Sequence, residues 1–224
     1  MDTTTQPLAF DELSNSAKQH AIQEYGQPPD DWHEEIIARF KHQGLERGFE
    51  IAEIKFTGFH SQGDGASWTG FVYLQQFIEY HSKPKDSDYT QYSILAELIK
   101  DGWCDGSVEI NRSGFYYNHS GTMRSAGVDE RLQYAEDDSV MDGGILDGAN
   151  VIELAKSIDY EYLLKQLDEW ILSKACAYAN EIYAQLREEY EAYTEAEYFK
   201  DLCDINGWRF DKRGILIEGF HHGI

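Results

Sequence analysis

The longest stretch without glycine or proline, residues 149–206, limits the folds open to this 224-residue chain most. All four prolines and 15 of the 19 glycines precede it. A run of this length that is rich in Ala, Glu, Leu and Lys predicts helix. Its apolar residues recur every three or four positions and therefore form one stripe along a helix, which consists of Leu163, Leu167, Ile171, Ala175, Tyr178, Ile182, Leu186, Tyr190 and Tyr193.

If residues 160–193 form one continuous helix, that helix is about 50 Å long, so we expect it either to kink or to project from the domain. Thr194, with Glu197 three residues later, has the pattern of an N-cap and predicts a further short helix ending near Cys203.

The part of the chain before residue 149 predicts a mixture of helices and strands. Helical patterns begin at Phe10 and at Asp31 and end at Gly26 and Gly44. Alternating or β-rich segments predict strands and two hairpins, at residues 49–56, 67–74, 108–110 with 115–117, 123–134, and 208–210 with 214–217. The expected fold class is α+β, with an antiparallel sheet, helices packed on one side of it and a long helical C-terminal part.

These patterns divide the chain into three parts. Residues 1–148 form a mixed α+β domain with glycine-rich loops, and residues 149–206 form an acidic helical region. Residues 207–224 form a C-terminal hairpin that we expect to pack on the first domain.

The charge of the chain is strongly one-sided. The 41 Asp and Glu residues against 19 Lys and Arg give a formal net charge of −22. Such a chain is repelled by phosphate backbones and by anionic membrane surfaces, so we expect neither direct nucleic-acid binding nor membrane binding. The sequence shows no signal peptide and no apolar run long enough for a membrane span. These observations predict a soluble protein of the cytoplasm.

The sharpest local motif is the segment Gly58-Phe59-His60-Ser61-Gln62-Gly63-Asp64-Gly65-Ala66-Ser67-Trp68. Glycines flank Asp64, so a ligand could approach the backbone closely, with Asp64 as metal ligand or general base beside His60, Ser61 and Gln62. The segment matches neither a calcium-binding EF-hand loop nor a phosphate-binding loop. The alternative is a hairpin connection in which Ser61, Gln62 and Asp64 bind the amides of the turn.

Other chemical signatures are weak. The eight histidines show no H-E-x-x-H pattern and no pair at helical spacing, and no cysteine has a basic neighbour. The sequence therefore predicts no catalytic residues, no metal and no cofactor, and we expect a protein that is not an enzyme.

Two motifs carry a resemblance to a known family. They are Phe10-Asp11-Glu12-Leu13-Ser14 and the S-Q-G-D-G-A-S loop at residues 61–67. Both resemble segments of a family of small bacteriophage and prophage proteins. These proteins are often labelled loosely as antitoxins of toxin–antitoxin stability systems. Asn206-Gly207-Trp208-Arg209-Phe210 is similar to their closing hairpin. The resemblance implies phage origin and expression in the cytoplasm of a bacterial host.

The acidic residues are spread along the chain, and two of their clusters are candidate partner-binding sites. One is Glu136, Asp137 and Asp138. The other is a helical row with spacings of seven, three and four residues, followed by Glu197, and it consists of Glu181, Glu188, Glu191, Glu195 and Glu197. Carboxylates spaced in this way resemble the phosphates of a nucleic-acid strand.

Tyr183 and Tyr198 lie off the apolar stripe, where exposed rings favour an interface, and a helix this long is also compatible with a homodimer. Together these features predict a phage-encoded acidic inhibitor of the anti-CRISPR or anti-restriction type. Its partner is expected to be a basic nucleic-acid-binding protein of the host, blocked by nucleic-acid mimicry. The alternatives are an antitoxin that neutralises a cognate toxin, and a small enzyme or ligand-binding domain built on the His60–Asp64 loop.

Overall fold

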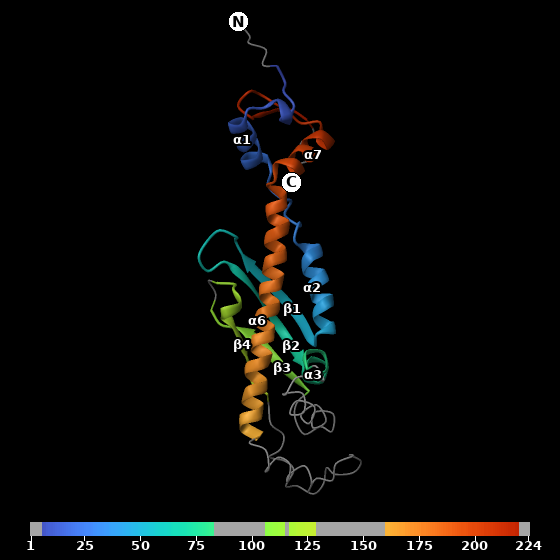
Figure 1. The fold of residues 1–224 in the computed structure, drawn as a ribbon, viewed down its shortest axis with the longest axis vertical. Coiled ribbons are helices and arrows are strands. Elements are labelled where there is room, and N and C mark those ends of the chain that lie inside the picture. Colours follow the sequence, from blue (N-terminus) through green and yellow to red (C-terminus); the bar gives the residue numbers. More distant parts are fainter. Residues whose placement is uncertain (1–5, 83–105, 115–116, 129–159, 220–224) are drawn as a thin grey trace. The chain divides into compact units, whose positions relative to one another are not determined.

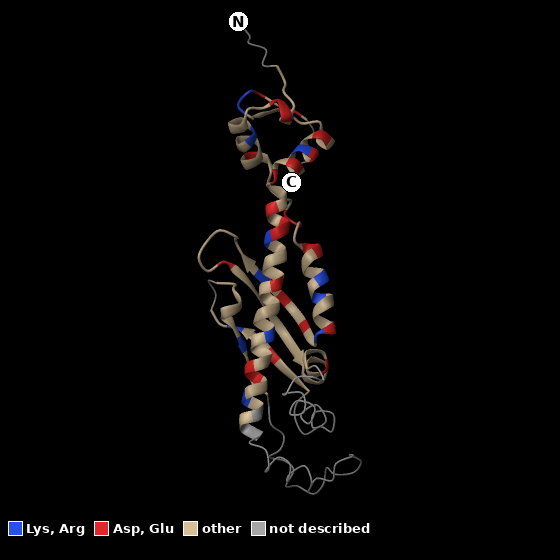
Figure 2. Ribbon diagram, in the orientation of Figure 1, with Lys and Arg blue, Asp and Glu red and all other residues tan. Residues whose placement is uncertain are grey.

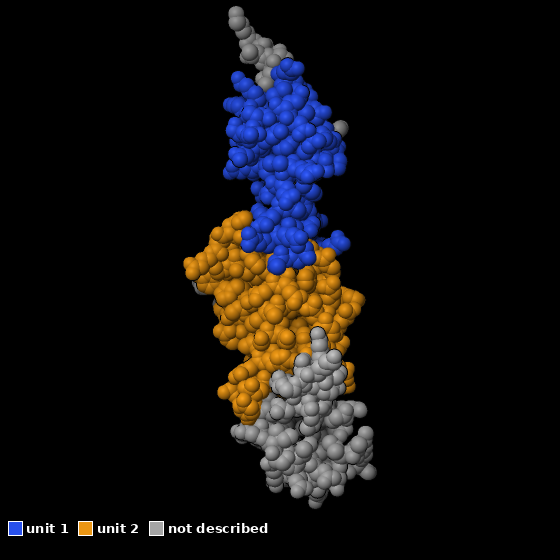
Figure 3. All heavy atoms as spheres, in the orientation of Figure 1, with its two compact units in different colours: residues 1–35, 184–224 blue, residues 36–183 orange. Residues whose placement is uncertain are grey.

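The computed structural model describes residues 6–82, 106–114, 117–128 and 160–219 (Figure 1). The chain forms two compact units (Figure 3): unit 1 comprises residues 1–35 and 184–224, and unit 2 comprises residues 36–183. The predicted division into 1–148, 149–206 and 207–224 follows glycine content rather than packing, and it stays a prediction. Within the described residues, no helix is both long and apolar enough to cross a membrane.

Unit 2 is built on a four-stranded antiparallel sheet in the order β1-β2-β3-β4. The strands are β1 (Phe49–Thr57), β2 (Gly65–Tyr73), β3 (Ser107–Arg112) and β4 (Met123–Ser125). The long helix α6 (Tyr160–Tyr193) and helix α2 (Glu34–Glu46) lie on one side of this sheet (Figure 1). The predicted α+β class, with an antiparallel sheet and a long helical C-terminal part, is therefore confirmed.

The apolar stripe of α6 supplies much of the core of unit 2. Leu167, Ile171, Ala175 and Ile182 are fully buried. The indole of Trp68 in β2 donates a hydrogen bond to the carbonyl of Ala175, at 3.2 Å. The hydroxyl of Tyr178 donates to the carbonyl of Phe40 in α2, at 2.7 Å. The polar tips of both large aromatic residues thus find partners, which lets their rings be buried.

Two glycines allow close backbone approaches in unit 2. The register of β1 and β2 shifts between Ile51 and Glu53, opposite Gly70. Gly70 has a φ of +152°, and a Cβ there would lie 2.0 Å from the carbonyl oxygen of Glu50, so only glycine fits. Gly44, predicted to end a helix, instead lies inside α2, where it is buried. Because it has no side chain, Ile51 and Tyr178 can pack directly against this part of the helix.

Of the hairpin predicted between residues 108–110 and 115–117, the first strand is confirmed as part of β3, and residues 115 and 116 of the second lie outside the described residues. β3 pairs with β4, with Ile110 opposite Ser125 and Arg112 opposite Met123. The connection folds back on itself through the amide of Ser113, which donates to the carbonyl of Thr122 at 2.7 Å. Local turn residues therefore do not decide the partner of β3. Helix α3 (Leu74–His81) follows β2, and the helix predicted near residues 93–99 lies outside the described residues.

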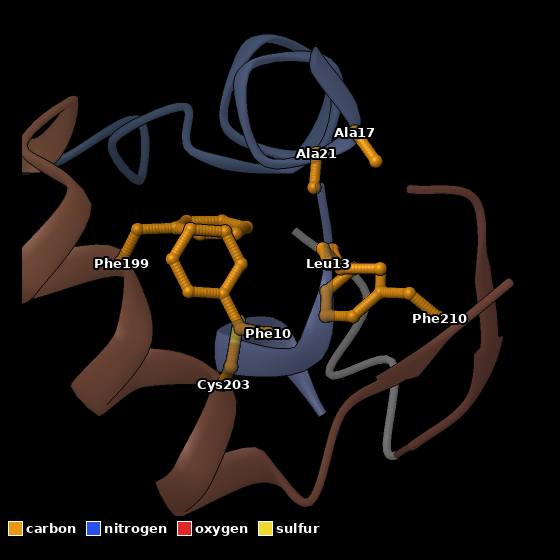
Figure 4. Packing of buried hydrophobic residues seen from close by; sticks show 7 residues of the cluster. All are labelled: Phe10, Leu13, Ala17, Ala21, Phe199, Cys203 and Phe210. Carbon is orange, nitrogen blue, oxygen red and sulfur yellow. The ribbon is translucent and has the colours of Figure 1, made fainter. Parts of the chain in front are cut away.

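Unit 1 joins two distant parts of the chain around one core. It contains the 3₁₀ turn η1 (Phe10–Glu12), α1 (Asn15–Tyr25), α7 (Ala196–Asn206), β5 (Arg209–Phe210) and β6 (Leu216–Glu218). Figure 4 shows the buried side chains of the two parts pointing toward one another, and they are Phe10, Leu13, Ala17, Ala21, Phe199, Cys203 and Phe210. The F-D-E-L-S residues and the closing hairpin, which carry the resemblance, thus contribute to one core.

The ends of α1 and of the hairpin are fixed by polar side chains. The single helix predicted from Phe10 breaks at Leu13, whose backbone is extended, and Ser14 then caps α1 by accepting the amide of Ala17. Asp211 accepts hydrogen bonds from the amides of Ile215, at 3.0 Å, and Arg213, at 2.8 Å. The bond from Ile215 is the largest cause of a lowered pKa of the Asp211 carboxyl.

Candidate functional site

The loop between β1 and β2 uses its carboxylate to hold its own backbone. Oδ2 of Asp64 accepts hydrogen bonds from the amides of His60, at 2.9 Å, and Ser61, at 2.6 Å. The amide of Asp64 donates to the carbonyl of Ser61 at 3.2 Å. Asp64 therefore closes the turn, while His60, Ser61 and Gln62 are exposed.

Aromatic side chains anchor the same loop within unit 2. The hydroxyl of Tyr183, from α6, donates to the carbonyl of Gly58 at 3.0 Å. The ring of Phe59 stacks on Phe56 and on Tyr183, with centroid distances of 6.2 and 5.5 Å. Tyr183 is thus half-buried, whereas the sequence predicted an exposed interface residue. Across the described ranges, no group of three or more His, Cys, Asp or Glu residues could hold a metal ion.

The first member of the predicted carboxylate row, Glu181, is paired inside unit 2. Its Oε2 lies 2.8 Å from a guanidinium nitrogen of Arg47. The same guanidinium lies 4.5 Å from the centroid of the Tyr178 ring. Glu181 therefore neutralises a cation that already packs on the core, and little of its charge is left for a partner.

The remaining members of the row lie in unit 1, where the regular spacing ends early. Glu191 pairs with Arg187 at 2.6 Å, and Glu188 accepts a hydrogen bond from the side chain of Gln185 at 3.2 Å. Helix α6 then ends at Tyr193. The predicted row is therefore helical only as far as Glu191.

The chain turns sharply between α6 and α7. Thr194, predicted as an N-cap, instead donates its hydroxyl to the carbonyl of Glu191 at 2.8 Å and so closes the end of α6. Glu195 has an extended backbone and precedes the first residue of α7, and Glu197 lies in the first turn of α7. A carboxylate at that position also stabilises the helix N-terminus. Both side chains are exposed.

Four acidic residues of this junction are exposed, namely Glu188, Glu189, Glu195 and Glu197. Figure 2 shows the concentration of Asp and Glu in this part of α6 and in α7. None of the four forms an ion pair within the part of the chain that the structure describes. The other predicted cluster, Glu136, Asp137 and Asp138, lies outside the described residues.

Unit 1 also contains an aromatic cluster. The Trp32 ring lies 5.8 Å from the Tyr190 ring and 6.5 Å from the Tyr193 ring, and Tyr193 lies 5.0 Å from Tyr198 in an edge-on contact. Burial raises the pKa of the Tyr193 hydroxyl, and Tyr198, Glu189 and Asp31 raise it further. Asp31 and Glu189 are therefore close enough to repel the ionised form of Tyr193.

We call this region the aromatic–acidic surface, which consists of Asp31, Trp32, Glu189, Tyr190, Tyr193, Glu195, Glu197 and Tyr198. Glu188, two residues before Tyr190 in α6, lies on a different face of the helix. Sequence reasoning assigned Tyr190 and Tyr193 to the core, but both are half-buried, and it identified Tyr198 as exposed, which is correct. It missed Trp32, because a lone Trp in a turn belongs to no periodic pattern. The richness of residues 188–198 in Glu and Tyr was the available signal.

Comparison with known proteins places the chain in a family. A family model described as a domain of unknown function (DUF8835) matches residues 32–196, and the chain therefore belongs to that family. No curated protein and no solved structure matches it.

Proposed function

We propose that this DUF8835 chain is an acidic binding protein that occupies the basic surface of a nucleic-acid-binding protein and thereby inhibits it. The observation that carries the proposal is the set of exposed carboxylates of the α6–α7 junction, Glu188, Glu189, Glu195 and Glu197, which have no ion pair within the described residues.

The surrounding charge supports this function. Unit 1 contains 17 Asp and Glu residues against 6 Lys and Arg. Carboxylates at this density attract a basic groove over about 10 Å at 0.1 M salt and compete with the phosphates that the groove normally binds. The motifs that resemble phage proteins favour a bacterial partner, such as a component of a CRISPR or restriction system, in the host cytoplasm. An antitoxin would use the same surface against a basic toxin.

The enzyme alternative receives no comparable support. Asp64 was the proposed base or metal ligand of the His60–Asp64 loop, and its Oδ2 already accepts two backbone amides. A carboxylate held in this way is explained by the turn that it closes.

The test replaces the exposed carboxylates. The immobilised chain captures partners from a bacterial lysate at low salt, and candidates are those released by high salt or by duplex DNA. The affinity of the purified partner is then measured for the triple variant Glu188→Lys, Glu195→Lys and Glu197→Lys. We expect at least about tenfold weaker binding and a weaker salt dependence.

The matched control makes the same charge change on exposed residues of unit 2, by Glu46→Lys, Glu79→Lys and Glu109→Lys. It should weaken binding much less. An equal loss in both triple variants would mean that only the total charge matters. A partner indifferent to salt and to DNA would refute nucleic-acid mimicry.

A further inference from the structure

The aromatic–acidic surface offers more than negative charge to a partner. Tyr198 is 42% exposed and meets Tyr193 edge-on. Trp32 and Tyr190 are half-buried beside them, with their ring planes inclined by 56°. A surface that only imitated phosphates would not require four large aromatic side chains, which cost more to leave in water than polar ones.

Carboxylates flank these rings. Asp31 and Glu189 act on the hydroxyl of Tyr193. Glu195 and Glu197 precede Tyr198 by three residues and by one residue. Between residues 184 and 199 the sequence contains five Glu and a single cation, Arg187, which pairs with Glu191. The rings thus lie in a strongly negative environment.

Arginine and lysine respond differently to such a surface. A guanidinium group is planar, stacks on aromatic rings and donates paired hydrogen bonds to a carboxylate. An ammonium group is strongly hydrated and gains mainly from the charge. A purely electrostatic phosphate mimic would bind the two cations about equally.

We propose that the aromatic–acidic surface selects arginine side chains, with the guanidinium group on the Tyr198 and Tyr193 rings and the neighbouring carboxylates as acceptors. This inference rests on the proposed function and adds the chemistry of the contact: the bound element of the partner is an arginine-bearing segment. Such a segment also contacts phosphates in nucleic-acid-binding proteins.

The experiment compares two short peptides on the full chain by titration calorimetry at low salt, one of alternating arginine and glycine and one of alternating lysine and glycine. We expect the arginine peptide to bind at least about threefold more tightly. Tyr198→Leu should abolish this preference and leave the affinity for the lysine peptide nearly unchanged.

Two further variants separate recognition from folding. Tyr198→Phe keeps the aromatic ring and should keep the preference for the arginine peptide. A variant that merely perturbs the fold would instead lose affinity for both the arginine and the lysine peptide. Phe71→Leu removes an aromatic residue of unit 2 that is 44% exposed, and it should change neither affinity.

The outcomes distinguish this inference from the proposed function. Equal binding of both peptides, weakened by the triple lysine variant of Glu188, Glu195 and Glu197, would overturn the arginine preference and leave the acidic binding function standing. Peptide binding that the triple variant does not weaken would overturn both. A preference for arginine that survives Tyr198→Leu and Tyr193→Leu would place the arginine site elsewhere and refute this assignment.

Discussion

Unit 1 and unit 2 carry the same net charge, −11 each, although unit 1 is about half as long. Unit 2 balances 24 acidic residues with 13 Lys and Arg, whereas unit 1 has 17 and 6. The family match covers residues 32–196, which include all of unit 2 but leave α1 and the closing hairpin outside. The sheet of unit 2 therefore lies wholly inside the matched region. Unit 1, which has more net negative charge per residue, lies partly outside it.

The largest expected effect tests whether the units are stable independently. Phe210→Ala removes a fully buried ring from the core of unit 1 and should cost about 3–5 kcal/mol. Because that core is small, we expect α1 and α7 to lose amide hydrogen-exchange protection while β1 and β2 keep theirs.

Phe49→Ala, in the core of unit 2, is the matched control and should produce the reverse pattern. Loss of protection in β1 and β2 after Phe210→Ala would show that the two units unfold together.

A second change tests the sheet of unit 2 alone. Gly70→Ala would place a Cβ 2.0 Å from the carbonyl oxygen of Glu50, so we expect a loss of about 2–3 kcal/mol in the free energy of unfolding, measured with urea. Gly114→Ala is the control, because Gly114 also has a positive φ, of +87°, but no atom of the described residues lies within 4 Å of the position that its Cβ would take. Its cost should be only about 1 kcal/mol, and equal losses would refute the steric explanation.

The smallest expected effect is a pH dependence confined to unit 2. Burial lowers the pKa of His81 from 6.5 to about 4, and the positive charges of Lys174 and Arg47 contribute. Because His81 has the higher pKa in the unfolded state, the unfolded state binds the proton more readily below pH 6.5. The contribution of neutral His81 to the free energy of unfolding is therefore fully present at neutral pH and decreases as the pH falls toward 4. Allowing for the partial exposure of His81, we expect the free energy of unfolding of the wild-type protein to be about 1 kcal/mol lower at about pH 5.5 than at neutral pH because of this residue.

His81→Phe should lack this component. Urea unfolding of both proteins at neutral pH and at about pH 5.5 isolates it as a difference, because the other histidines are common to both. An identical pH dependence in the two proteins would contradict the assignment to His81.

Much of the fold could be predicted from the sequence because it depends on local patterns. The run without glycine or proline predicts α6 from Tyr160 to Tyr193, and alternation predicts β1 within a residue of its end. The partner of β3 could not be predicted in this way. Strand pairing depends on the long connection closed by Ser113 and Thr122, and that contact has no signature in the flanking residues.

The candidate site was less predictable than the fold, because the sequence does not show how a charge is used. Glu181 and Glu188 look alike as letters at helical spacing, yet only Glu181 faces an arginine held on a tyrosine ring. The role of Asp64 is equally ambiguous in the sequence. An Asp between two glycines is compatible with a ligand site and also with a turn in which its carboxylate accepts backbone amides, and the structure shows the second. The role of each depends on residues far away in the sequence or on backbone amides, which are the same for every residue type.

The bridge between Leu8 and Phe210, whose backbones exchange hydrogen bonds of 2.9 Å in both directions, sets the order in which the molecule can be completed during synthesis. Residues 36–183 are continuous, so unit 2 can acquire its core before residue 210 has left the ribosome. Residues 8–25 must wait for α7 and the hairpin, with their apolar side chains uncovered until then. Closing a loop of about two hundred residues is slow relative to local folding. Of the two units, unit 1 can therefore complete its core only after the hairpin has been translated, later than unit 2.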